Sequence, residues 1–138
     1  MERKVIILID GENISAKKAD RIVTVSNSLG SDIVRRVYHR RKDPATREWA
    51  QKCESGDYKE ICIPGRPARN KVDHVIQKEA REYMKKDDID LVCIVSSDGD
   101  FCCLEADAAN AGKELCFIVG KKLSKRFSRS GARWMRLG

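Results

Sequence analysis

The chain has 138 residues, a length typical of one domain that buries a hydrophobic core without disulfide bonds. Hydrophobic residues make up 41% and charged residues 36%, with a net charge of +7, and this balance argues against a disordered chain. No run of about 18 apolar residues exists, which excludes a membrane-spanning helix, and the apolar run at residues 5–9 is too short for a secretory signal. We therefore expect a single domain over residues 1–138 that stays in the cytoplasm and binds no membrane.

The first half of the chain alternates apolar runs with amphipathic ones. Residues 4–9 are a continuous, mostly β-branched run that ends at Asp10, which predicts a buried strand. Further along we expect a helix over 15–29, a strand over 32–38, a short helix over 44–53 that begins with a proline, and a strand over 58–63.

The second half continues the alternation. A stripe of Val72, Ile76 and Ala80 predicts a helix over 70–85, followed by a fully apolar strand over 90–95. We then expect a helix over 98–111, a strand over 115–119, a turn of helix at 123–127 and a short last element at 132–137. Continuous apolar strands alternating with helices predict a mostly parallel sheet with helices on both faces.

Carboxylates follow two of these strands, where the chain enters a helix. Asp10 follows the first strand, and Asp98 and Asp100 follow the fourth, so a parallel sheet places all three at one edge. A single aspartate there is explained by a turn or a helix N-cap. Three together repel one another, which favours a bound hard cation such as Mg²⁺. Asp73, in the first turn of a helix, is a fourth candidate, although the helix dipole alone also explains its position.

Three motifs lie at these positions: Asp-Gly-Glu-Asn at residues 10–13, an asparagine at 70 three residues ahead of an aspartate at 73, and Ser-Ser-Asp-Gly-Asp-Phe at 96–101. Together they resemble the NYN domain family, a branch of the PIN-like metal-dependent ribonucleases. The resemblance spans about residues 4–120. It implies a Rossmann-like, three-layer α/β/α PIN-like fold with a mostly parallel central sheet and an acidic pocket at the carboxyl edge of that sheet.

The resemblance also implies an activity and a set of residues. The expected reaction is hydrolysis of RNA phosphodiester bonds by water activated on Mg²⁺ or Mn²⁺. The implied catalytic residues are Asp10, Asn13, Asp73, Asp98 and Asp100, and the four aspartates are the implied metal ligands. Substrate binding is expected at Arg69, Asn70, Lys71, Ser96, Ser97, Lys121, Lys122, Lys125 and Arg126. Members of the family often have Lys-Asn or Lys-Gly ahead of the helix acid, so which cation here faces the phosphate stays open.

The carboxy-terminal segment, residues 121–138, holds seven Lys or Arg and no Asp or Glu, and so carries the whole positive excess of the chain. Such a block suits a phosphate backbone, with a solvated tail as the alternative. Arg35, Arg36, Arg40, Arg41 and Lys42 are expected to add to this charge. Candidate residues for base stacking are Tyr38 and Trp134, with core packing as the alternative.

Two other functions stay open. A Toprim domain also places Asp-x-Asp after a strand, but it uses a glutamate after its first strand, where this chain has Asp10. The second is a PIN-like module that binds RNA or protein without cutting, although the presence of all four acids weighs against it. RNA is the expected partner, and the sequence leaves open a second copy of the chain or another protein.

Overall fold

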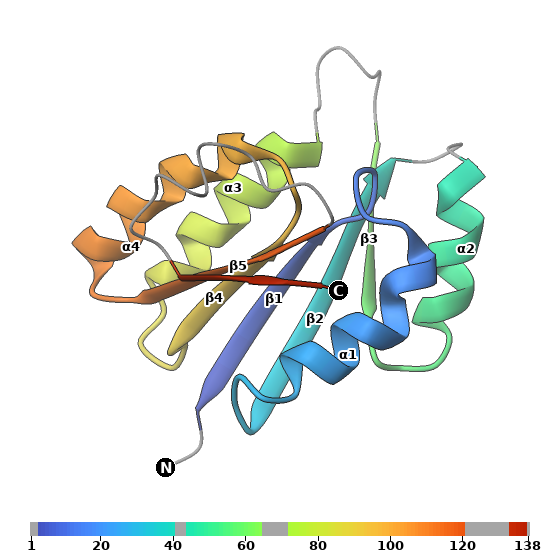
Figure 1. Ribbon diagram of the computed structural model, residues 1–138. Helices are drawn as coiled ribbons and strands as arrows, with labels where there is room; N and C mark the ends of the chain where they lie inside the picture. Colours follow the sequence, from blue (N-terminus) through green and yellow to red (C-terminus); the bar gives the residue numbers. More distant parts are fainter. Residues whose placement is uncertain (1–2, 41–43, 65–71, 121–132, 138) are drawn as a thin grey trace.

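Six parallel strands form one central sheet in the order β3-β2-β1-β4-β5-β6 (Figure 1). They are β1 Lys4–Asp10, β2 Asp32–Arg40, β3 Lys59–Ile63, β4 Leu91–Val95, β5 Glu114–Val119 and β6 Arg133–Arg136. Every neighbouring pair is parallel, so all six carboxyl ends lie at the same edge. This computed structural model describes residues 3–40, 44–64, 72–120 and 133–137.

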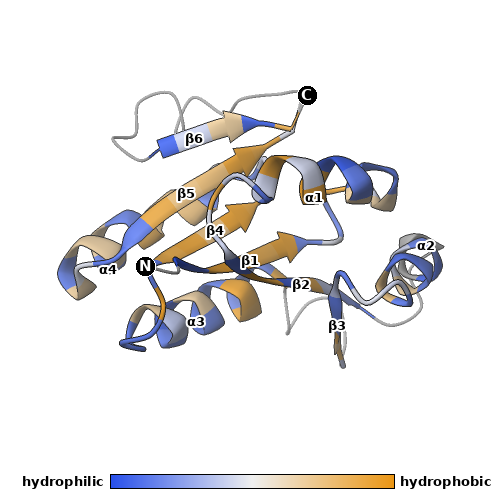
Figure 2. Cartoon of the chain, turned by 90° about the horizontal axis from the view of Figure 1, so that it is seen from below, coloured by the Kyte–Doolittle hydropathy of each residue, from blue (hydrophilic) through white to orange (hydrophobic). Residues whose placement is uncertain are grey.

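Helices cover both faces of the sheet (Figure 2). On one face lie α1 Ala19–Ser26, which follows a 3₁₀ turn at Ala16–Lys18, and α2 Pro44–Cys53. On the other lie α3 Val72–Met84 and α4 Leu104–Ala111, the latter preceded by a 3₁₀ helix at Gly99–Cys103. Within the described residues, none of these helices is both long and apolar enough to cross a membrane.

The core is divided by the sheet into two layers. Val5, Ile7 and Ile9 of β1 pack with α1 and α2, while Ile6 and Leu8 pack with α3 and α4. Alternate residues of a strand point to opposite faces, so a strand buried on both sides has to be apolar throughout. Burying one such side chain contributes about 1.5–3 kcal/mol to the free energy of unfolding. The two central strands, β1 and β4, therefore form a rigid base for the loops at their carboxyl ends.

The structure confirms the predicted α/β fold, with the sheet parallel throughout. The expected helices over 15–29 and 98–111 each begin with a 3₁₀ segment before the α-helix, and the others agree within a few residues. Residues 133–136 form a sixth strand, which the sequence indicated only as a short element because two of its four residues are arginines. The turn of helix expected at 123–127 lies outside the described residues.

The loop after β1 runs close against β2. The backbone N–H of Gly11 donates to the carbonyl of Tyr38 at 2.8 Å, and a Cβ at this position would lie 2.7 Å from that oxygen. Because no larger residue fits without a shift of the backbone, glycine here allows the chain to turn directly at the end of β1. The turn brings residues 12 and 13 over the carboxyl edge of the sheet.

Candidate metal centre

A cavity of about 420 Å³ lies at the carboxyl edge, where the loops after β1 and β4 meet the first turn of α3. Its described lining contains five carboxylates, one guanidinium and two uncharged residues: Asp10, Glu12, Asp73, Asp98, Asp100, Arg40, Asn13 and Val72. All four aspartates predicted from the sequence are therefore brought to one cavity, and Asn13 lies with them. The excess of negative charge makes this a candidate site for a cation.

Asp10 forms the buried floor of the cavity, with 1% of its surface exposed. Its Oδ2 accepts hydrogen bonds from Asn13 Nδ2 at 2.6 Å and from Ser96 Oγ at 3.1 Å, and its Oδ1 accepts from the backbone N–H of Glu12 at 3.3 Å. Burial raises the pKa of the Asp10 carboxyl above its ordinary value, whereas the hydrogen bonds from Asn13 and Ser96 oppose that rise. These contacts fix the orientation of the carboxylate.

The other three aspartates form a cluster at the mouth of the cavity. Asp73, Asp98 and Asp100 each offer one oxygen atom, and these atoms all lie within 4.8 Å of one another. Oxygen ligands on opposite sides of Mg²⁺ lie about 4 Å apart, since each Mg–O bond is about 2.0–2.1 Å. The donor set is therefore of the right chemistry and nearly the right spacing for a small divalent cation.

Local backbone structure explains how two of these acids come together. Asp98 is the N-cap of the 3₁₀ helix, and its Oδ1 accepts from the backbone N–H of Asp100 at 2.9 Å. The backbone N–H of Asp98 in turn donates to Ser96 Oγ at 3.1 Å. Because Ser96 also donates to Asp10, one buried hydroxyl joins the loop after β4 to the end of β1. The N-cap that the sequence offered as an alternative explanation for Asp98 is thus present within the same cluster.

The two serines predicted to bind substrate are engaged within the protein. Ser96 is fully buried between Asp10 and Asp98, and Ser97 Oγ accepts from the backbone N–H of Gly120 at 2.8 Å, at the end of β5. Their contact with substrate stays a prediction. The other predicted substrate-binding residues lie outside the described residues: Arg69, Asn70, Lys71, Lys121, Lys122, Lys125 and Arg126.

Two charged residues of the cavity are not among the site residues predicted from the sequence. Glu12 and Arg40 line it and form an ion pair through Arg40 Nε and Glu12 Oε1. A signal was present in the sequence, since Glu12 lies within the motif at residues 10–13 and Arg40 ends the strand next to β1. Their pairing joins side chains 28 positions apart, which the pattern of residue types alone does not reveal.

The arginines of β2 do not form the free positive surface that the sequence indicated. Arg35 is buried and donates to the side chains of Ser26 and Asn27. Arg36 pairs with Glu79 of α3 at 2.9 Å and donates to Tyr38 Oη at 3.0 Å. Tyr38 itself is fully buried, so it packs in the core and is not a stacking surface. These arginines hold the helix and sheet together instead.

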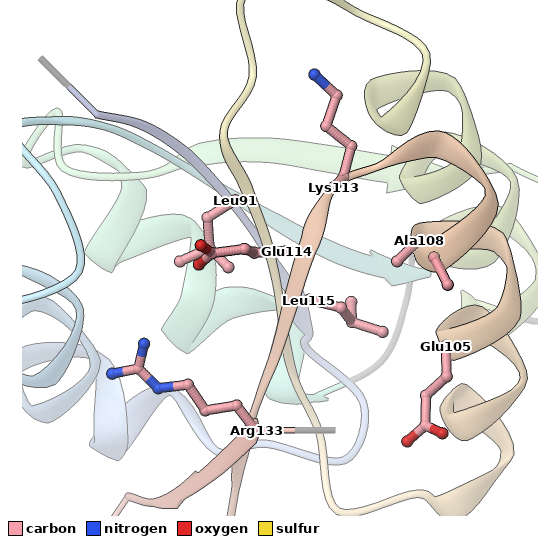
Figure 3. Close-up of a pocket in the computed structure, with 8 residues that line it drawn as sticks. Leu91, Glu105, Ala108, Lys113, Glu114, Leu115 and Arg133 are labelled. Carbon is pink, nitrogen blue, oxygen red and sulfur yellow. The ribbon is translucent and has the colours of Figure 1, made fainter. Parts of the chain in front are cut away.

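A second cavity of about 420 Å³ lies at the opposite, amino edge of the sheet (Figure 3). Leu91, Leu115 and Ala108 contribute apolar surface to it. Its charged side chains are two acids and two bases, namely Glu105, Glu114, Lys113 and Arg133, and Glu114 also pairs with Arg3. The charges of this cavity are therefore balanced, and its described residues contain no metal-binding cluster of the kind found at the carboxyl edge.

A parallel sheet covered on both faces, with a cluster of acids at its carboxyl edge, defines a Rossmann-like α/β protein with a candidate cation site. The family model of the NYN domain matches residues 4–134, nearly the whole chain. The chain belongs to the NYN domain family, whose members are PIN-like nucleases that generally depend on divalent metal ions. No curated protein matches the sequence.

Two solved structures are similar to this chain at low identity. One is an NAD binding oxidoreductase from Klebsiella pneumoniae, with 18% identity and a TM-score of 0.42 over 97% of this chain and 34% of that one. The other is the apo form of levoglucosan dehydrogenase, with 15% identity and a TM-score of 0.39 over 88% of this chain and 27% of that one. This chain thus spans about a third of the length of the oxidoreductase.

Proposed function

We propose that this domain hydrolyses RNA phosphodiester bonds with Mg²⁺ or Mn²⁺ held at the carboxyl-edge cavity. The observation that carries the proposal is the meeting of Asp73, Asp98 and Asp100, whose oxygen atoms lie within 4.8 Å of one another. They come from two separate parts of the chain, and a cluster of like charges lowers stability unless a cation compensates it. Membership of a nuclease family supports the same proposal.

Each of the four aspartates of the cavity has a part in this proposal. Asp73, Asp98 and Asp100 hold the ion, and Asp100, the most exposed of the three, orients the attacking water. When bound, a divalent ion lowers the pKa of a coordinated water and polarises the phosphoryl oxygens. Asp10, which the resemblance implies as a fourth ligand, is held by Asn13 and Ser96 and adds a fixed negative charge to the cavity.

In this proposal the cations of the chain bind the phosphates of the RNA. Arg40 lies in the same cavity as the acids, where a guanidinium offsets the negative charge of a phosphate. From the resemblance, Arg69, Asn70 and Lys71 contact the phosphate as well. We assign the basic segment, residues 121–138, to the binding of the RNA backbone as part of a single domain over residues 1–138, with contacts at Lys121, Lys122, Lys125 and Arg126.

The test is incubation of the purified chain with end-labelled RNA and DNA in Mg²⁺, Mn²⁺ or EDTA. We expect RNA to be cut in one or both metals, to stay intact in EDTA, and to stay intact with the Asp98→Asn variant. Glu105→Gln, in the amino-edge cavity, is the matched control that keeps activity. Single-stranded, structured and transfer RNAs that all stay intact in both metals would instead indicate a binding module without catalysis.

A further inference from the structure

Trp134 is the large hydrophobic side chain that stands exposed among the described residues, with 37% of its surface open to solvent. It lies on β6, the outermost strand beyond β5 (Figure 2). The other tryptophan, Trp49, is fully buried and donates its indole N–H to the carbonyl of Ile14 at 3.0 Å. Core packing explains Trp49 but leaves the exposed face of Trp134 without a role in the fold.

One cation lies against this ring. The guanidinium of Arg136 lies over Trp134, 5.9 Å from the ring centroid. Arg133 is exposed on the same strand, but as the neighbouring residue it points to the other face of the sheet. Both arginines belong to the segment, residues 121–138, that carries the whole positive excess of the chain. An aromatic face beside cations is the combination that binds single-stranded nucleic acid, since bases stack on the ring and phosphates meet the cations.

The sheet places Trp134 on the same side as the helix that carries Asp73. In register, Trp134 pairs with Phe117 of β5, which pairs with Ile94 of β4. Residues paired in register on adjacent strands point to the same face of a sheet. Ile94 and Phe117 pack with α3 and α4, so Trp134 points to that face too. Adjacent strands are about 4.8 Å apart, so the backbone of Trp134 lies about 10 Å across the sheet from Ile94. The chain leaving Ile94 reaches Ser96 and Asp98 within four residues.

We propose that Trp134 is a stacking site for one unpaired base of single-stranded RNA, with Arg136 beside it, and that it holds the strand whose backbone enters the acidic cavity. Bases of a duplex are already stacked on each other and do not reach such a ring, so the site favours single strands. That the strand held here continues to the acidic cavity rests on the proposed function, whereas the stacking itself does not require catalysis.

The test is a titration of tryptophan emission with a short oligouridine in EDTA, where no metal-dependent cleavage occurs. We expect saturable quenching in the parent chain and none with a duplex RNA of the same length. In Trp134→Phe the remaining emission comes from the buried Trp49 and should not respond to RNA. Binding of labelled oligouridine, followed by anisotropy, should weaken about tenfold in Trp134→Ala. The slope of log affinity against log salt should become shallower by about 0.7 in Arg136→Gln.

Both Trp134 variants are first checked for an unchanged melting temperature. If Trp134→Ala unfolds, Trp134→Phe keeps an aromatic ring at this position and still allows the emission titration. Equal affinity for oligouridine in the parent and in a folded Trp134→Ala, or no quenching of the parent's emission by oligouridine, overturns the proposal. Emission that changes with protein concentration and not with RNA also overturns it, because the edge of β6 then pairs two copies of the chain. Since the titration contains no metal, a chain without nuclease activity can still show the stacking site, and an active nuclease can lack it.

Discussion

Two cavities among the described residues have the same volume, about 420 Å³ each, and lie at opposite edges of one sheet. At the amino edge, two acids face two bases around apolar side chains, and Glu114 is further paired with Arg3. At the carboxyl edge, five carboxylates share the described lining with Arg40 alone as a cation. The fold thus balances charge at one edge and concentrates it at the other.

The comparison shows that volume does not distinguish these two cavities, whereas the charge of their linings does. Like charges brought together lower stability, and a chain under no functional constraint loses them easily by mutation. The carboxyl edge is also where the loops of a parallel sheet converge, so the acids arrive there from separate segments. Function is therefore expected at the edge where the fold leaves charge unbalanced.

The largest expected effect is on cleavage of RNA. Asp98→Asn removes one negative charge from the three-aspartate cluster while it keeps the shape of the side chain and one oxygen. We expect kcat/KM to fall at least about 100-fold, because the ion is held less tightly and its water is less acidic. The measurement is initial rates in saturating Mn²⁺.

Glu105→Gln, which makes the same chemical change in the amino-edge cavity, is the control and should stay within about twofold of the parent. Equal losses in the two variants, or a fully active Asp98→Asn, would break the contrast between the two edges.

The second expected effect is on stability. A cation that binds only the folded chain raises the free energy of unfolding, by about 2.7 kcal/mol when the free ion is at 100 times its dissociation constant. We expect Mn²⁺ to raise the melting temperature of the parent and of Glu105→Gln, and to have little effect on a variant with both Asp73→Asn and Asp98→Asn. A shift of equal size in the double variant would place the ion elsewhere.

The third effect concerns the buried hydroxyl that joins the two loops. Ser96→Ala removes the hydrogen bonds to Asp10 and from the backbone of Asp98, which leaves Asp10 Oδ2 with Asn13 as its remaining partner and takes the hydroxyl acceptor from the backbone N–H of Asp98. We expect the free energy of unfolding to fall by about 1–3 kcal/mol, measured by urea denaturation in EDTA. Ser97→Ala, whose hydroxyl accepts a single bond from Gly120, should cost less. The reverse order of the two losses would show that Ser96 does not join the loops.

The smallest effect is a gain. Arg40→Gln removes the one cation from the described lining of the acidic cavity, so the attraction for a second cation should increase. We expect the affinity for Mn²⁺, measured by calorimetry, to rise about threefold, a modest change because solvent screens the charge. Arg133→Gln at the amino edge should produce no Mn²⁺ site. Weaker binding by Arg40→Gln would mean that Arg40 orients the acids through Glu12.

The sequence predicted the frame of the site well, for a physical reason. The short apolar runs at 5–9 and 91–95, rich in β-branched residues, favour buried strands, and parallel strands end at one edge, which places Asp10 and Asp98 together. The four-residue strand β6 was predicted only as a short element, because its arginines resemble a solvated segment. Its pairing with β5 is what makes it a strand.

Side-chain pairing in the cavity was less predictable. Asp10 accepts hydrogen bonds from Asn13, Ser96 and the backbone N–H of Glu12, whereas Asp73 joins the cluster from α3. Which carboxylates meet depends on rotamers and on contacts between loops that lie far apart in the sequence. The ion pair between Arg36 and Glu79 likewise depends on a contact between distant segments, and the sequence pattern did not reveal it.

The central claim is that a divalent cation binds the carboxyl-edge cavity and not the amino-edge one, and a paramagnetic ion tests it most directly. A small amount of Mn²⁺ is added to the isotope-labelled chain, and the loss of backbone amide signals is followed by NMR. We predict that signals near Asp73, Asp98 and Asp100 broaden first, while those of Lys113, Glu114 and Arg133 remain sharp. Equal broadening at both edges, or none at the carboxyl edge, would contradict the claim.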